Sequence, residues 1–385
     1  MLLIKGADVY APEHLGKMDV LAAGGRIERI GERLPEYEGC EVIDGTGKLV
    51  TPGIIDRHVH ITGGGGEGSF HTQAPPVQLS KLIEGGVTTV VGVLGTDGIS
   101  RSVENLVAKA KALKEEGISV FCTCGAYGYP SPTITGTIDK DILFVDEIIG
   151  LKLAVSDHRA PNITVDELIR LGSDVRTAGM LSGKAGIICL HMGGDKRGLE
   201  PIFEALERTS IPIKTFQPTH VGRSEKLQSD AFKFAKMGGT IDITCGQFER
   251  KIQSVAASLR AALAEGVPMD KVTLSSDGQG SWSNYDAAGN LTEMGVSEVN
   301  TIYRQIVHEV KEEKLPFEQA ILFGTSNVAK ALELYPKKGA VREGSDADLL
   351  VWNEELSLEA VIANGTVMMK DGVLKKRGTY ESTEK

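Results

Sequence analysis

The sequence predicts an α/β fold: a (β/α)8 TIM-like barrel with a small β-sandwich domain formed by both chain termini. Three observations support this prediction. The chain has 385 residues, and a barrel of about 250 residues leaves room for one small accessory domain. Both ends are rich in short strands, whereas the middle alternates strand-like and helix-like segments. We therefore assign residues 1–50 and 346–385 to the small domain and residues 51–345 to the barrel.

Short apolar runs between glycine-containing turns predict the strands of the small domain. At the N-terminal end they lie at residues 2–4, 19–22, 25–27 and 41–43, and at the C-terminal end at residues 347–352, 358–363 and 367–369. Asn364-Gly365 and Asp371-Gly372 are typical hairpin turns. Because the N-terminal and C-terminal segments are both rich in short strands and the middle of the chain is not, we expect the two segments to form one domain together.

The middle of the chain repeats a strand followed by a helix. Strand candidates lie at residues 87–94, 119–124, 186–191, 213–219, 240–244 and 272–276, and helical periods at 103–116, 199–209, 226–236 and 255–265. A doubly wound open sheet is the alternative. No Gly-x-Gly-x-x-Gly lies directly after a first strand, because the run Gly63-Gly64-Gly65-Gly66 follows the histidine pair instead, so the pattern favours the barrel.

Composition excludes several classes of function. The formal net charge of −10 argues against nucleic acid or a membrane surface as a partner. Five cysteines without a Cys-x-x-Cys pair fit a reduced, cytoplasmic protein. The first apolar run is too short for a signal peptide, and no apolar stretch approaches the about 20 residues that a membrane helix needs.

A pair of histidines follows the first strand of the predicted barrel. His58 and His60 end the segment Pro52-Gly53-Ile54-Ile55-Asp56-Arg57-His58-Val59-His60. Residues two apart on a strand point the same way, so both imidazoles can face one metal ion. Such a pair alone is weak evidence, because solvent-facing pairs of this kind are common.

Four further polar residues lie in or at the ends of apolar strands. His191, His220 and Asp277 each end a predicted strand, and Lys152 lies in the apolar run 148–155. Any one of them could be structural. Together they favour a metal at the C-terminal end of the barrel, and imidazole with carboxylate suits zinc.

Lys152 allows two interpretations. It is either a snorkelling or ion-paired lysine, or a buried amine with a lowered pKa. A neutral amine can react with carbon dioxide to give a carbamate, which is an anionic oxygen ligand that can bridge two metals.

Taken together, these residues resemble the amidohydrolase superfamily and, within it, the isoaspartyl dipeptidases. The segment from Pro52 to His60 is similar to the superfamily's first-strand signature, and residues 344–351 to its return into the small domain. The motifs that mark the subgroup are Gly63-Gly64-Gly65-Gly66-Glu67, Leu94-Gly95-Thr96-Asp97, Gly125-Ala126-Tyr127, Ser156-Asp157-His158-Arg159, Pro218-Thr219-His220-Val221-Gly222-Arg223 and Ser275-Ser276-Asp277-Gly278. The resemblance covers essentially the whole chain.

The resemblance implies a site with two zinc ions, bridged by carboxylated Lys152 and a hydroxide. His58, His60 and Asp277 would hold one ion, and His191 and His220 the other. Asp277 would act as general base and then as general acid, and Tyr127 would hydrogen-bond the scissile carbonyl. The residues implied in substrate binding are Gly65, Glu67, Thr96, Tyr127, Arg159, Arg223 and Ser281.

The implied substrate is a small β-aspartyl (isoaspartyl) dipeptide. Glu67 would bind its free α-ammonium group, and Arg159 and Arg223, with Ser281, its carboxylates. The resemblance also implies a homo-oligomer, with an octamer as the candidate assembly. The alternatives are a cyclic-amide hydrolase such as a dihydroorotase or hydantoinase, an N-acyl-amino-acid hydrolase, and a non-catalytic scaffold with this fold. A carboxylate at position 67 suits a substrate with a free ammonium group, whereas a cyclic amide has no such group for Glu67 to bind.

Overall fold

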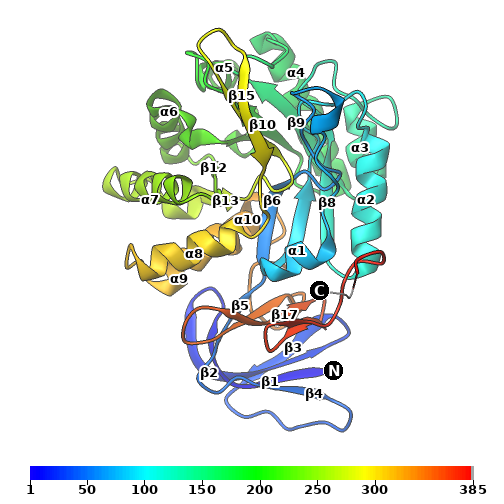
Figure 1. Cartoon of the computed structure of the whole chain (residues 1–385), viewed down its shortest axis with the longest axis vertical. Coiled ribbons are helices and arrows are strands. Elements are labelled where there is room, and N and C mark those ends of the chain that lie inside the picture. The colour runs from blue at the N-terminus through cyan, green and yellow to red at the C-terminus, as the bar shows by residue number, and fades with distance from the viewer. Residues whose placement is uncertain (383–385) are drawn as a thin grey trace.

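Eight parallel strands form a barrel at the centre of the computed structural model, which describes residues 1–382 (Figure 1). The strands are β6 (Ile54–Val59), β7 (Val87–Gly92), β8 (Ser119–Gly125), β9 (Ile148–Val155), β10 (Ile187–Met192), β11 (Phe216–Thr219), β12 (Ile241–Thr244) and β13 (Val272–Ser275). A parallel bridge between Val59 and Gly278 joins the first strand to the segment after the last. There the His60 amide donates to the Gly278 carbonyl at 2.9 Å. The predicted (β/α)8 barrel is confirmed.

A helix follows each barrel strand and packs on the outside of the sheet (Figure 1). These helices are α1 (Leu79–Glu84), α2 (Val103–Glu116), α3 (Ile138–Phe144), α4 (Val165–Ser182), α5 (Glu200–Arg208), α6 (Glu225–Lys236), α7 (Glu249–Ala264) and α8 (Thr301–Lys311). Two short helices, α9 (Phe317–Ala320) and α10 (Ser326–Ala331), lead back to the small domain. Sequence-local signals set several helix starts: Thr164 and Glu167 form a capping box at α4.

Both chain ends build one mixed nine-stranded sheet, which Figure 1 shows below the barrel. Its strands are β1 (Leu2–Tyr10), β2 (His14–Ala23), β3 (Arg26–Gly31), β4 (Glu41–Asp44), β5 (Leu49–Pro52), β16 (Leu349–Trp352), β17 (Leu358–Ala363), β18 (Thr366–Lys370) and β19 (Val373–Leu374). Buried side chains from both ends, among them Leu2, Val20, Val50 and Leu349, form one cluster. The sheet therefore curls around a core of its own, and the prediction of a small domain built from both termini is confirmed.

A β-hairpin after the last barrel strand is an addition to the predicted barrel. It consists of β14 (Ser281–Tyr285) and β15 (Leu291–Val296), which pair in antiparallel fashion. Figure 1 shows it at the end of the barrel opposite the small domain. Within residues 1–382, no helix combines the length and the apolar character that crossing a membrane requires.

Candidate metal centre and substrate pocket

Five of the six predicted metal ligands lie at or just after the C-terminal ends of barrel strands, and the sixth, Lys152, lies inside one. His58 is in β6 and His60 directly follows it, Lys152 is in β9, and His191 is in β10. His220 directly follows β11, and Asp277 lies two residues after β13. Parallel strands of a barrel end on one face, so residues distant in sequence meet there.

His58, His60 and Asp277 form a group of three that could hold a cation. The Asp277 Oδ1 atom lies 3.1 Å from His60 Nε2 and 3.5 Å from His58 Nε2. The amine of Lys152 lies 2.9 Å from His58 Nε2. A carboxylate, two imidazoles and a lysine thus converge on one point.

His191 and His220 lie beside this group. Their ring centroids are 4.6 Å apart, and the ring of His220 is 5.0 Å from that of His58. The structure therefore brings all six predicted ligands into one cluster, with His191 and His220 adjacent to the three-residue group.

The chemistry of these donors fits a metal. Burial, together with neighbouring cations, holds the pKa values of His58, His191 and His220 well below their usual range, so the imidazoles are neutral and can donate lone pairs. Burial likewise lowers the pKa of Lys152, whose side chain is fully buried. A buried amine beside neutral imidazoles, with no carboxylate paired to it among the described residues, is explained better by a ligand role than by a structural ion pair.

Hydrogen bonds around the cluster orient the ligands. His220 Nδ1 pairs with Thr244 Oγ1 at 2.6 Å, and the Tyr127 hydroxyl lies 2.6 Å from His191 Nδ1. Asp56 accepts from the His58 and Ser276 amides, at 3.2 Å in both cases, and so ties β6 to the segment that carries Asp277. Burial raises the pKa of Asp56 to about 7. Such partners fix the direction of ligand side chains.

The backbone is strained where two strands deliver their ligands. His220 has φ 64° and Asp277 has φ 53°, both in the left-handed region that residues other than glycine rarely adopt. Each such conformation costs on the order of 1 kcal/mol and persists where the surrounding structure enforces it. Both residues stand where a strand, β11 or β13, gives way to the loop that follows it.

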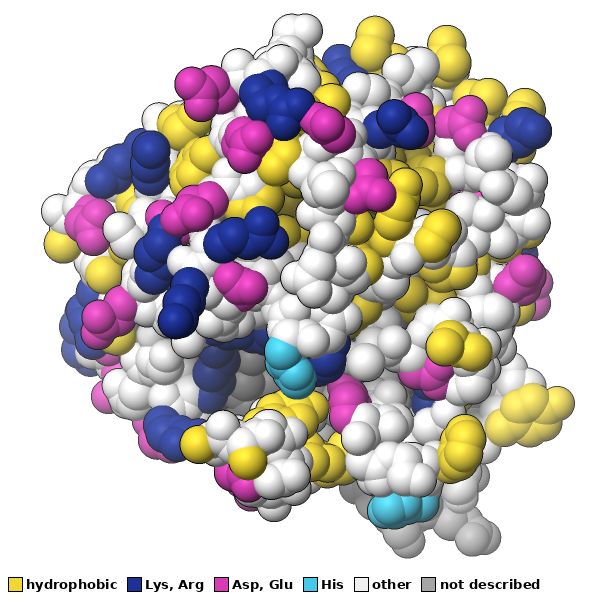
Figure 2. Space-filling view, turned by 90° about the horizontal axis from the view of Figure 1, so that it is seen from above, with side chains coloured by type: hydrophobic (Ala, Val, Ile, Leu, Met, Phe, Trp, Pro, Cys, Tyr) yellow, Lys and Arg dark blue, Asp and Glu magenta, His cyan; other side chains and the backbone are white. Residues whose placement is uncertain are grey.

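A cavity of about 730 Å³ opens above the cluster. Seen from above, at the end of the molecule opposite the small domain, the surface carries interspersed basic and acidic side chains around a hollow (Figure 2). All seven predicted substrate-binding residues line the cavity, as do His60, His220 and Asp277. A cavity of this size suits a small molecule.

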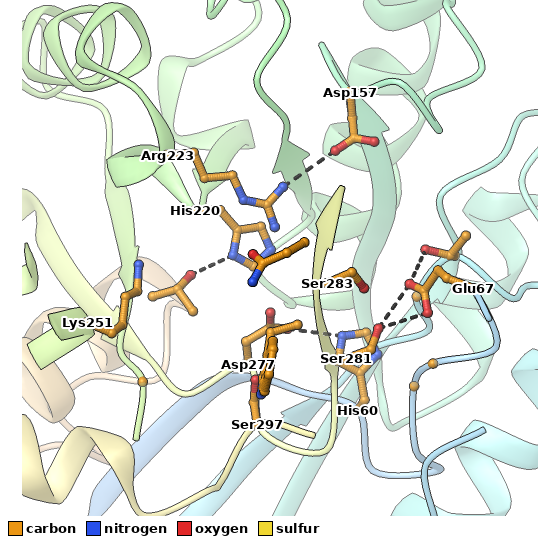
Figure 3. A pocket seen from close by; sticks show the side chains of 18 of the residues that line it. His60, Glu67, Asp157, His220, Arg223, Lys251, Asp277, Ser281, Ser283 and Ser297 are labelled. Carbon is orange, nitrogen blue, oxygen red and sulfur yellow. Dashed lines mark hydrogen bonds and ion pairs between the residues drawn. The ribbon is translucent and has the colours of Figure 1, made fainter. Parts of the chain in front are cut away.

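Glu67 is held on one wall of this cavity by three donors (Figure 3). The Ser281 hydroxyl lies 3.0 Å from each Glu67 carboxylate oxygen, and the Thr96 hydroxyl lies 3.1 Å from Oε1. The Arg159 guanidinium reaches the same oxygen at 3.4 Å. Ser281 therefore supports Glu67 in this structure, in addition to any contact that it makes with a substrate.

Asp157 is a residue of the site that sequence reasoning did not select. Its carboxylate accepts from Arg159 at 2.9 and 3.1 Å, and lies 3.1 Å from His191 Nε2 and 3.5 Å from Arg223 Nη1. Although burial opposes it, hydrogen bonds from His191 and Arg159 hold the pKa of Asp157 well below its usual range. The signal was present, because Asp157 lies inside the motif that contains Arg159.

Other lining residues were also missed, among them Thr244, Lys251 and Trp282. Thr244 ends β12, in the same strand-end pattern as the predicted ligands. Lys251 and Trp282 come from the first turn of α7 and from the hairpin, respectively. Neither segment has a clear apolar period, so no sequence pattern placed these two residues at the site.

Comparisons with known proteins identify the family of this chain. The profile of the Amidohydrolase family matches residues 49–375. The crystal structure of a beta-aspartyl dipeptidase from Fervidobacterium islandicum AW-1, in complex with β-Asp-Leu, superposes with a TM-score of 0.92 at 44% identity. That superposition covers 97% of this chain and 98% of the other.

More distant proteins share the same architecture. A D-hydantoinase structure is 18% identical with a TM-score of 0.69 over 99% of this chain and 98% of the other, which shows the fold alone. An imidazolonepropionase from Colwellia psychrerythraea is 24% identical over 90% of this chain and 87% of its own length. The matching profile and the 44% identical structure decide the assignment. The chain therefore belongs to the amidohydrolase family of hydrolases and, within it, to the group that contains the beta-aspartyl dipeptidases.

Proposed function

We propose that this protein hydrolyses β-aspartyl dipeptides at a site with two zinc ions. The observation that carries the proposal is the buried Glu67 carboxylate, presented by three donors in the same cavity as the metal-ligand cluster. A carboxylate held in this way suits the free ammonium group of the substrate. The similarity to a protein crystallised with β-Asp-Leu supports the same substrate class.

The residues present would hold the metals as follows. His58, His60 and Asp277 would hold one zinc ion and His191 and His220 the other, with carboxylated Lys152 between them. Bound zinc supplies Lewis acidity, which lowers the pKa of water and polarises a carbonyl oxygen. The carbamate forms when the neutral Lys152 amine adds to carbon dioxide and releases one proton.

The protein's own groups would carry the remaining chemistry. Asp277 accepts the proton of the attacking water and passes it to the nitrogen of the departing amine, which then leaves as a neutral amino group. Burial raises the pKa of Tyr127, so its phenol stays protonated and can donate to the scissile carbonyl oxygen. Arg159 and Arg223 bind the substrate's carboxylates, and Asp157 positions both guanidinium groups.

We also propose a cytoplasmic, homo-oligomeric protein, with an octamer as the candidate assembly. All five cysteines are free thiols, as expected in a reducing compartment. The oligomer rests on the family resemblance, and light scattering of the purified protein would measure its mass.

The substrate class is tested with N-succinyl-leucine, which is β-Asp-Leu without its α-ammonium group. We expect kcat/KM for β-Asp-Leu to exceed that for N-succinyl-leucine by about 10²-fold or more, because the analogue lacks the ammonium group that would make a charged contact with the Glu67 carboxylate. In Glu67→Gln the ratio of kcat/KM for β-Asp-Leu to that for N-succinyl-leucine should fall to a few-fold. Equal rates for the two compounds would instead indicate an N-acyl-amino-acid hydrolase, and cleavage of a hydantoin or dihydroorotate alone would indicate a cyclic-amide hydrolase.

A further inference from the structure

The charges that line the cavity are not all paired. Its acidic side chains are Glu67, Asp157, Asp277 and Glu293, and its lysine and arginine side chains are Arg159, Arg223, Arg250 and Lys251. Each acid has a partner: Glu67 and Asp157 contact the two arginines of the segments that follow β9 and β11, Asp277 contacts His60, and Glu293 accepts from Asn284. Among the described residues, the side chains of Arg250 and Lys251 have no ion-pair or hydrogen-bond partner. Arg250 is exposed, whereas Lys251 is partly buried.

Lys251 is held in place by its surroundings. It lies in the first turn of α7, and the preceding loop is tied to β15 and α8. Gln247 Nε2 donates to the Val296 carbonyl at 3.0 Å, and Arg304 Nη2 donates to the Gln247 carbonyl at 2.9 Å. The stem of Lys251 crosses Gly246 so closely that a Cβ atom there would lie 2.5 Å from Lys251 Cγ. The side chain is partly buried, and burial lowers the pKa of Lys251.

Lys251 and Glu67 lie on opposite sides of the cavity, with His220 and Asp277 between them (Figure 3). If Glu67 pairs with the ammonium group of a dipeptide, the Glu67 side of the cavity binds the aminoacyl half of that dipeptide. Asp277, as the donor to the departing nitrogen, marks the position of the scissile bond. The Lys251 end is then the place for the amino acid that leaves.

We propose that Lys251 binds an acidic side chain of the leaving amino acid, so that the preferred substrates are β-aspartyl dipeptides ending in glutamate or aspartate. This inference rests on the proposed function. Every β-aspartyl dipeptide carries two main-chain carboxylates, and the proposed function assigns these to Arg159 and Arg223, which Asp157 positions. Lys251 is a third cation, on the side of the cavity that would hold the leaving amino acid, and it has no anionic partner among the described residues. A carboxylate in the side chain of that amino acid would supply the partner.

The test compares β-Asp-Glu with β-Asp-Gln, which differ in charge but hardly in shape. We expect the wild-type kcat/KM to favour β-Asp-Glu by about tenfold, as for one charge-assisted contact. In Lys251→Met this preference should fall to about one, whereas Lys233→Met, which removes the same charge from the exposed face of α6, should keep it. Lys251→Glu should favour β-Asp-Lys over β-Asp-Glu. The ratio within each variant cancels any general loss of activity.

Binding of the products gives a readout that needs no turnover. Quenching of Trp282 fluorescence, from the wall of the same cavity, measures Kd for L-glutamate and L-glutamine. A wild-type protein that cleaves or binds both members of a pair equally would overturn the inference, as would a preference that survives in Lys251→Met. If neither dipeptide is cleaved, the proposed function fails. Even then, tighter binding of glutamate than of glutamine that depends on Lys251 would support a Lys251 subsite for acidic side chains. Equal binding of the two amino acids would reject it.

Discussion

Replacing Asp277 by asparagine should lower kcat for β-Asp-Leu by about 10³-fold or more. The substitution keeps the shape of the side chain but removes the group that would accept and return the proton, and general acid–base catalysis alone is worth about 10²- to 10⁴-fold. It also replaces an anionic oxygen that lies 3.1 Å from His60 Nε2 and 3.5 Å from His58 Nε2. Steady-state kinetics with matched metal loading measure the effect.

The matched control is Asp270→Asn, which makes the same change before β13, at the opposite end of that strand and in an exposed position. Its kcat should stay within about twofold of the wild type, as for surface substitutions in general. If Asp277→Asn with full metal content retained a kcat within tenfold of the wild type, Asp277 would not be the general base.

Replacing Lys152 by alanine should remove most of the bound zinc and nearly all activity, a loss of about 10³-fold or more if metal activation of water is removed. Lys152 is fully buried and lies 2.9 Å from His58 Nε2, at the centre of the ligand cluster. Zinc per subunit, measured by plasma emission spectrometry, and kcat should fall together. Acetate or propionate should restore part of both, because a small carboxylate can occupy the space left by the side chain.

Thermal unfolding separates a lost ligand from a lost fold in this variant. Removing a buried amine that lacks a carboxylate partner relieves a desolvation cost, so Lys152→Ala should still fold. Lys233→Ala provides the exposed control and should keep its zinc. Two zinc ions and full activity in Lys152→Ala would show that the lysine is not a ligand.

The arrangement of strands and helices could be predicted because burial leaves a clear trace in the sequence. β9, for example, is buried on both faces over all eight residues, and it reads as one continuous apolar run apart from Lys152. Helix starts were less predictable. α7 begins at Glu249, six residues before the predicted start at 255, because its first turn is polar and joins the cavity wall instead of the core.

The metal ligands could be predicted because strand ends of a barrel meet on one face. His191, His220 and Asp277 are separated by tens of residues, yet each ends an apolar run, and this placement alone brings them together. Contacts within and between loops could not be predicted in this way. The bonds of Asp157 to Arg159 and of Ser281 to Glu67 depend on side-chain directions that no periodicity records. The same holds for the hairpin that places Trp282 over the cavity.

The central claim is most directly tested by comparing β-Asp-Leu with α-Asp-Leu as substrates of the zinc-loaded protein, with a chelated sample as control. The account predicts cleavage of the β isomer alone, lost on chelation and restored by added zinc. Cleavage of both isomers at similar rates, or cleavage that persists after the metal is removed, would contradict it.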